Sequence, residues 1–155
     1  MKYRQLTKEQ FESLHEEFSK FLATQSIDVK EWTTIKTENP SLAEEEMNLF
    51  SDVVWEDVLN KTEYLEHFSP KTINLFKCFD NEIKRIVIKV DDDIDLLTEN
   101  GYNWLLEHYN NQEVSFFQGK KEYTTERNLE IFDLIEKGST ISNGDLFTFF
   151  EKIIS

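Results

Sequence analysis

The feature that most constrains the fold is a change of residue pattern after Pro70. Thr72 to Phe79 and Ile83 to Val90 are rich in β-branched and aromatic residues, and only the polar residues 80–82 separate them. Side chains of these types fit a pleated sheet, and a short polar connection lets two neighbouring strands pair. The sequence therefore predicts an antiparallel β-hairpin over residues 72–90.

A third strand is predicted further along the chain. Val114 to Phe117 is a short apolar run bounded by polar residues, which is typical of a strand. We interpret the residues that follow, Gly119 to Lys121, as a loop.

Helices are predicted over most of the remaining chain, because the same start signals recur. Thr7, Asp28, Ser41, Thr98 and Ser142 stand where an N-cap is expected, most of them beside apolar residues spaced to clamp the first turn. After each of them, apolar residues return every three or four positions, which is the spacing of one helical face. The predicted helices cover residues 7–25, 28–38, 42–61, 98–109, 125–137 and 142–154.

Together these segments predict an α+β protein, with a small, mostly antiparallel sheet of about three strands packed against about six helices. No long linker, internal repeat or low-complexity tract interrupts the order. We expect a single globular domain over residues 1–155.

The composition predicts a folded core despite a large negative charge. The 155 residues include 31 acidic and 17 basic side chains, a net charge of −14, but 39% of them are hydrophobic. This apolar fraction is too high for a disordered acidic tail. No apolar run approaches the ~18 residues of a membrane span, and no signal-peptide pattern follows Met1. The single cysteine, Cys78, can form no internal disulfide, and we interpret it as a small buried hydrophobic residue. We therefore expect a cytoplasmic protein that does not contact membranes.

The helix predicted over residues 42–61 carries an acidic edge. Glu45, Asp52 and Glu56 fall within about 20° of one line on the helical wheel, and large apolar side chains border them. Between residues 37 and 60 there are seven acidic residues and no basic one. A surface of one sign steers oppositely charged proteins toward it and repels nucleic acid. The predicted partner-binding residues are Glu45, Leu49, Asp52, Trp55, Glu56 and Leu59.

Asp91, Asp93 and Asp95 have the spacing that opens a calcium-binding loop. The pattern then fails, because Leu96 stands where the loop needs glycine and Tyr102 where it needs a bidentate glutamate. These three residues are weak metal candidates, and we interpret the segment as a solvated turn.

Motifs for catalysis and for cofactor binding are absent from the sequence. The histidines do not have zinc spacing, the four glycines form neither a dinucleotide nor a phosphate loop, and no serine has a nucleophile elbow around it. The sequence therefore predicts no catalytic residue, no metal and no cofactor. One other candidate cluster, Glu63, Glu66 and His67, lies where the long helix gives way to the sheet.

Five segments carry a resemblance to a known family. They are Met1 to Thr7, Phe21 to Ile27, Phe50 to Glu56, Tyr64 to His67 and Asp93 to Leu96. Over nearly its whole length the chain resembles a group of small acidic bacterial proteins known only as a domain of unknown function. That resemblance implies one cytoplasmic domain and brings no activity, cofactor or catalytic residue.

Three functions fit these observations. The leading hypothesis is a non-enzymatic interaction module that docks a basic protein partner through the acidic edge. The alternatives are a metal-dependent enzyme or ion-binding regulator that uses an acidic cluster, and a nucleic-acid mimic that inhibits a DNA-binding protein. The leading hypothesis requires the acidic edge to lie outside the molecule.

Overall fold

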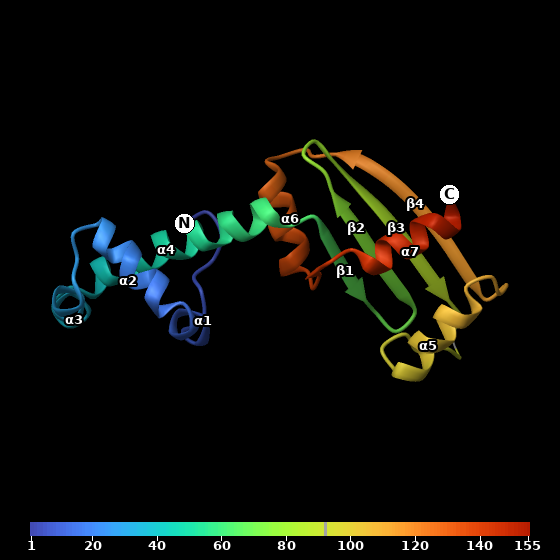
Figure 1. Ribbon diagram of the computed structural model, residues 1–155, viewed down its shortest axis with the longest axis horizontal. Helices are drawn as coiled ribbons and strands as arrows, with labels where there is room; N and C mark the ends of the chain where they lie inside the picture. The colour runs from blue at the N-terminus through green and yellow to red at the C-terminus, as the bar shows by residue number, and fades with distance from the viewer. Residues whose placement is uncertain (92) are drawn as a thin grey trace. The chain divides into compact units, whose positions relative to one another are not determined.

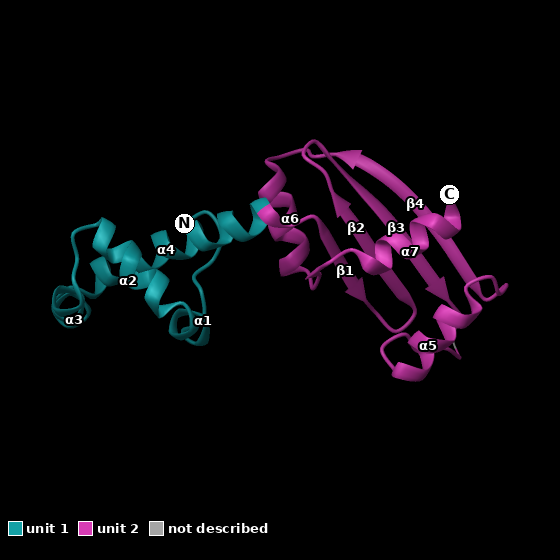
Figure 2. Cartoon of the chain, in the orientation of Figure 1, with its two compact units in different colours: residues 1–60 teal, residues 61–155 magenta. Residues whose placement is uncertain are grey.

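The computed structural model describes residues 1–91 and 93–155, so Asp92, within the predicted acidic turn, lies outside the described residues. The chain divides into two compact units, residues 1–60 and residues 61–155 (Figure 2). The expectation of a single domain stays a prediction, and each unit is described by itself.

The first unit is helical (Figure 1). Its helices are α1 (Lys8–Ser13), α2 (His15–Thr24), α3 (Val29–Glu38) and α4 (Pro40–Lys61), the last of which ends one residue beyond the unit. Thr7 is confirmed as an N-cap, and it forms a capping box with Gln10: the Thr7 side chain accepts from the Gln10 amide, and the Gln10 side chain accepts from the Thr7 amide. The single helix predicted over residues 7–25 is divided in two at Leu14, whose φ of −107° and ψ of 22° interrupt the helical backbone.

The long helix α4 begins earlier than predicted. The preceding helix α3 ends at Glu38, and Pro40 is already the first residue of α4. Between them, Asn39 Oδ1 accepts a hydrogen bond from Leu42 N at 3.3 Å. Proline suits this position because the first helical N–H has no intrahelical partner. The prediction of Ser41 as the N-cap is therefore wrong.

Aromatic rings form much of the interior of the first unit. The Phe18 ring lies 4.9 Å from Phe50 and 5.2 Å from Trp32, and the Phe21 ring lies 5.5 Å from Phe50, between ring centroids. These side chains come from α2, α3 and α4, so three helices contribute to one cluster. Such ring pairs add to the stabilisation that burial alone gives.

The second unit is built on a five-stranded antiparallel sheet with the order β4-β3-β2-β1-β5. Its elements are β1 (Tyr64–Phe68), β2 (Thr72–Cys78), β3 (Glu82–Val90), α5 (Glu99–His108), β4 (Val114–Glu122), α6 (Arg127–Glu136), β5 (Thr140–Ser142) and α7 (Asp145–Ile154). The predicted hairpin is confirmed as β2 and β3, and the α+β class is confirmed.

The strand count differs from the predicted three. Gly119 to Lys121 is part of β4 and not a loop, because β3 continues to Glu82 and pairs with β4 along its whole length. The strands β1 and β5 were not predicted. The final helix is not capped by Ser142; its N-cap is Gly144, whose φ of +86° suits glycine.

The two faces of the sheet have different surroundings. On one face, the main core joins β2, β3 and β4 to α5 and α7, and it includes the fully buried Ile73, Ile86, Ile88, Leu105 and Phe150. Alternate residues of a strand point to opposite faces. The other face is only partly covered, by α6, and it carries the groove described below.

Candidate functional site

The N-terminal segment, defined as residues 2–6, is hydrogen-bonded to α4. The Lys2 and Tyr3 amides donate to the two carboxylate oxygens of Asp52, at 2.7 and 2.9 Å. Lys2 Nζ also lies 3.5 Å from Glu56 Oε2. Two of the three carboxylates of the predicted acidic edge are therefore engaged by the chain's own donors.

Tyr3 makes a second contact with this edge. Its hydroxyl donates to Glu56 Oε2. Burial, reinforced by the hydrogen bond to Glu56 and by the charge of that carboxylate, raises the pKa of Tyr3 to about 12. The phenol therefore keeps its proton, and its role as a donor, throughout the physiological pH range.

The rest of the N-terminal segment extends these contacts along the helix. Gln5 Nε2 donates to Glu44 Oε2 at 2.8 Å, and Leu6 N donates to Ser51 Oγ at 3.0 Å. The Arg4 guanidinium lies 5.0 Å from the centre of the Trp55 ring, which is the geometry of a cation–π contact.

The six predicted partner-binding residues do not all lie on an exposed face. Leu59 is fully buried and Trp55 is 8% exposed, so neither has the exposure expected of a surface anchor, and their role in partner binding stays a prediction. Asp52 and Glu56 are half-buried beside the N-terminal segment. Only Glu45 and Leu49 are exposed as expected. A helical wheel cannot show that a distant segment folds back over one edge of the helix.

The exposed surface of α4 is displaced by one row from the predicted edge. Leu49 is 53% exposed and Val53 is 56% exposed. They stand four residues apart, so their side chains are neighbours on one helical face, and Glu45 precedes them at the same spacing. We call Glu45, Leu49 and Val53 the α4 strip. Sequence reasoning missed Val53, although its spacing from Leu49 was a usable signal.

The weak metal candidates occupy a turn whose polar groups serve the backbone. Asp95 Oδ1 accepts from Leu97 N at 2.9 Å, and the Asp95 carbonyl accepts from the Thr98 hydroxyl at 2.7 Å. Asp91 and Asp93 are exposed. Over residues 1–91 and 93–155, no three carboxylate, histidine or cysteine side chains are grouped closely enough to hold a metal ion.

The alternative cluster of Glu63, Glu66 and His67 is not assembled by the fold. Glu66 and His67 are successive residues of β1, so their side chains point to opposite faces of the sheet. Burial raises the pKa of Glu66, which lies on the α7 face opposite Leu75. His67 lies on the other face, at the end of the groove.

Cys78 is buried, as predicted. Burial raises the pKa of its thiol to about 11, although the nearby charge of Arg127 acts in the opposite direction. The thiol is protonated at neutral pH, so Cys78 is a packing residue and not a nucleophile.

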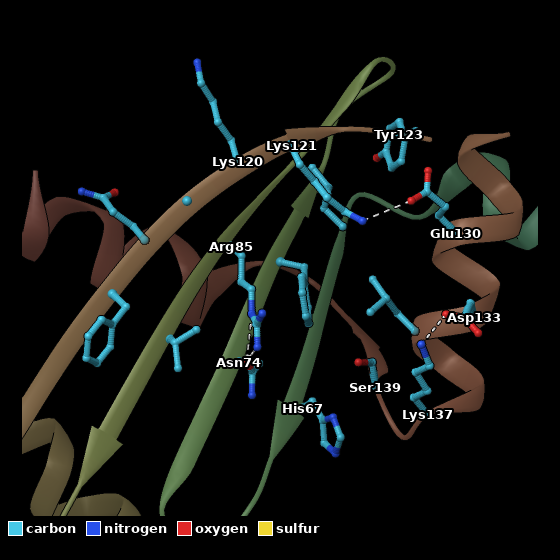
Figure 3. Close-up of a pocket in the computed structure, with 17 residues that line it drawn as sticks. His67, Asn74, Arg85, Lys120, Lys121, Tyr123, Glu130, Asp133, Lys137 and Ser139 are labelled. Atoms are coloured by element: carbon cyan, nitrogen blue, oxygen red, sulfur yellow. Dashed lines mark hydrogen bonds and ion pairs between the residues drawn. The ribbon is translucent and has the colours of Figure 1, made fainter. Parts of the chain in front are cut away.

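A groove of about 680 Å³ crosses the partly covered face of the sheet, between α6 and β4 (Figure 3). Apolar side chains of the sheet and of α6 line its floor and wall: Phe76, Ile83, Val87, Phe117 and Leu134. Its volume is within the range of small-molecule sites in proteins.

Arg85 lies on the floor of this groove. Its guanidinium donates through Nε, at 2.9 Å, and through Nη2 to Asn74 Oδ1 on the neighbouring strand. The guanidinium also lies 5.7 Å from the centre of the Phe76 ring. These contacts hold Arg85 in place while the edge formed by Nη1 and Nη2 stays available.

The other cations that reach into the groove are paired with α6. Lys121 Nζ lies 3.3 Å from Glu130 Oε1, and Lys137 Nζ lies 2.7 Å from Asp133 Oδ2 (Figure 3). The side chain of Lys120 extends away from the groove. Arg85 differs from both paired lysines, because its partner in the groove is a neutral amide.

Arg127 fixes α6 as one wall of the groove. Its Nε donates to the Phe79 carbonyl at 3.0 Å, and its Nη2 donates to the Thr62 carbonyl at 2.6 Å. These bonds join the first turn of α6 to the end of β2 and to the start of the unit. Sequence reasoning missed the groove, because a strand pattern does not show which face of a sheet a later helix leaves open.

The comparisons with known proteins place the chain in a family. A family model matches residues 1–155, which is the whole chain. The chain belongs to DUF6495, a family of unknown function. This confirms the resemblance to a domain of unknown function. No curated protein and no solved structure matches the chain.

Among the residues that the structure describes, every helix is too short or too polar to cross a bilayer.

Proposed function

We propose that the chain is a non-enzymatic interaction module of the cytoplasm, which docks a basic protein partner through the α4 strip. The observation that carries the proposal is the pair of large apolar side chains, Leu49 and Val53, both more than half exposed and one helical turn apart. Exposed apolar surface rimmed by polar residues is a feature of protein-interaction sites.

The charge of the first unit supports a basic partner. It has 13 acidic and six basic residues, a net charge of −7. Glu45 precedes Leu49 on the same face, and Glu44 and Asp52 lie on neighbouring rows of the helix. A field of one sign raises the association rate of a positively charged protein, and it weakens as salt screens it.

Burial of the two apolar side chains would supply the affinity. Complete burial of a leucine or valine side chain contributes about 1.5–3 kcal/mol relative to full exposure. Leu49 and Val53 are already partly covered, so their combined contribution is expected to be about 2–3 kcal/mol. The carboxylates around these two side chains then mainly orient the partner and raise its association rate, and they add less to the affinity.

The test compares three baits in affinity capture from the source cell. The first is the native chain, the second is L49K/V53K, and the third is V29K, which places a lysine at another exposed apolar position of the first unit, 74% exposed in α3. We expect a basic protein that the native chain and V29K retain and that L49K/V53K loses. The purified pair should bind at least tenfold more weakly when salt rises from 50 to about 300 mM.

Three results would contradict the proposal. They are retention of the same proteins by all three baits, a captured protein that is acidic, and an affinity that does not change with salt. Capture of a DNA-binding enzyme that DNA itself displaces would instead support the nucleic-acid mimic.

A further inference from the structure

We propose that the groove between α6 and β4 binds a small organic carboxylate with an apolar body. In this assignment the carboxylate pairs with Arg85, and the apolar body covers Val87 and Phe117. The inference is independent of the α4 strip, since the groove lies wholly within the second unit.

Arg85 has the geometry of an anion receptor. Asn74 occupies the side of the guanidinium formed by Nε and Nη2. Among the described residues no carboxylate forms an ion pair with Arg85, although the chain has 31 acidic residues. The edge formed by Nη1 and Nη2 presents two parallel donors, which match a carboxylate in a bidentate arrangement.

The strand register places an apolar platform beside this receptor. Arg85 is followed two residues later by Val87 on the same face of β3, and Val87 is opposite Phe117 of β4. Phe117 is 53% exposed. A few polar groups that orient a ligand over an otherwise apolar lining are typical of small-molecule sites.

Gly119 leaves the approach to Arg85 open. It is the residue of β4 directly opposite Arg85. A Cβ atom built on Gly119 would meet nothing within 4 Å, and its backbone is in a conformation that other residues adopt. The fold therefore does not require glycine here, even though glycine weakens the interior of a strand. Close approach of a ligand to the backbone at this position would explain why a glycine stands there.

The charge of the groove selects an anion. Arg85, Lys121 and Lys137 contribute three positive charges, and Glu130 and Asp133 contribute two negative ones. The positive charge inside the groove attracts a small anion that can enter it. The surrounding protein, in a chain of net charge −14, repels an acidic macromolecule that is too large to enter. This favours a small ligand over an acidic peptide.

The probe for the experiment is 2-naphthoate, titrated into the full chain and followed by amide NMR shifts and calorimetry. We expect saturable binding, with the largest shifts at Arg85, Phe117 and Gly119. The uncharged analogue 2-naphthalenemethanol and the head group alone, as acetate, should each bind at least tenfold more weakly.

Two variants and two matched controls locate the site. R85Q removes the receptor, and G119V fills the approach with a β-branched side chain that suits a strand. Each should weaken 2-naphthoate binding about tenfold or more, and G119V should keep or raise the melting temperature. K152Q removes one positive charge elsewhere in the unit, and S115V adds a valine on the same face of β4 outside the groove. Both controls should bind within twofold of the native chain.

The proposal is overturned if 2-naphthoate does not bind, if the uncharged analogue binds equally well, or if a folded G119V binds as tightly as the native chain. Tighter binding of an extended peptide of alternating Glu and Phe would also overturn it, because the groove would then recognise a protein segment.

Discussion

Glu46 is a buried acidic residue with an uncompensated carboxylate oxygen. It is 7% exposed, and its Oε2 atom is buried without a hydrogen-bond partner among the described residues. Burying a polar group without such a partner costs about 1–3 kcal/mol. Methionine has a similar shape and needs no partner. We therefore expect E46M to raise the free energy of unfolding by about 1–2 kcal/mol.

Urea denaturation at neutral pH measures this change. E45Q is the control, because Glu45 is exposed and its substitution should stay within about 0.5 kcal/mol. If E46M instead lowers the free energy of unfolding by more than E45Q does, the Glu46 carboxylate has a stabilising partner, and this interpretation is wrong.

Tyr3 gives a prediction about pH. Its pKa is raised from 10.0 to about 12 in the folded chain. Between these values the unfolded chain loses the phenolic proton while the folded chain keeps it, so folding stability falls as pH rises from 10 toward 12. The difference between the tyrosinate absorbance titrations of the native chain and Y3F should therefore have a midpoint near 12. A midpoint near 10 would show that Tyr3 is not held against Glu56.

At the scale of elements, Asp52 anchors the N-terminal segment to α4. Its carboxylate accepts from the amides of both Lys2 and Tyr3. Hydrogen bonds to a charged group contribute about 1.5–3 kcal/mol each when well shielded, and Asp52 is only half-buried. We expect D52A to lower the free energy of unfolding by about 1–3 kcal/mol.

Hydrogen exchange distinguishes local release from general loosening. In D52A, the amides of residues 2–6 should exchange much faster, while those of β2 and β3 keep their protection. E45A removes another carboxylate of the same helix and should leave the segment protected. Unchanged exchange at residues 2–6 in D52A would contradict the anchoring role.

At the scale of the whole molecule, the second unit contains the complete sheet and a core of its own. Every residue of the main hydrophobic cluster lies between Ile73 and Phe150. A unit of 95 residues buries enough surface to fold without a metal or a disulfide, whereas a 60-residue helical unit is marginal. We expect residues 61–155 expressed alone to fold cooperatively.

Circular dichroism and amide NMR spectra test this expectation. The fragment should give the mixed strand and helix signal of the sheet unit, with dispersed amide shifts that coincide with those of the full chain for β2, β3 and β4. A disordered spectrum would mean that the two units fold only together, which would favour the single domain predicted from the sequence.

The sequence by itself determined the structures that depend on neighbours along the chain. The Thr7 capping box joins residues three apart, and the hairpin of β2 and β3 needs only alternation and a short polar turn. Gly138 follows the end of α6 with a φ of +116°, a backbone conformation that glycine adopts readily and that ends a helix within a few residues. Each of these choices is made within a few residues, so local preference and the final fold agree.

Only the tertiary structure decided which surfaces stay exposed. The bond between Tyr3 and Asp52 joins residues 49 positions apart, and it changes the surroundings of an edge that the helical wheel had placed in solvent. The extension of β4 through Gly119 likewise depends on pairing with β3, not on the propensity of its own residues. The α4 strip and the groove are what remains uncovered after these long-range contacts form, and no local pattern records what a distant segment will cover.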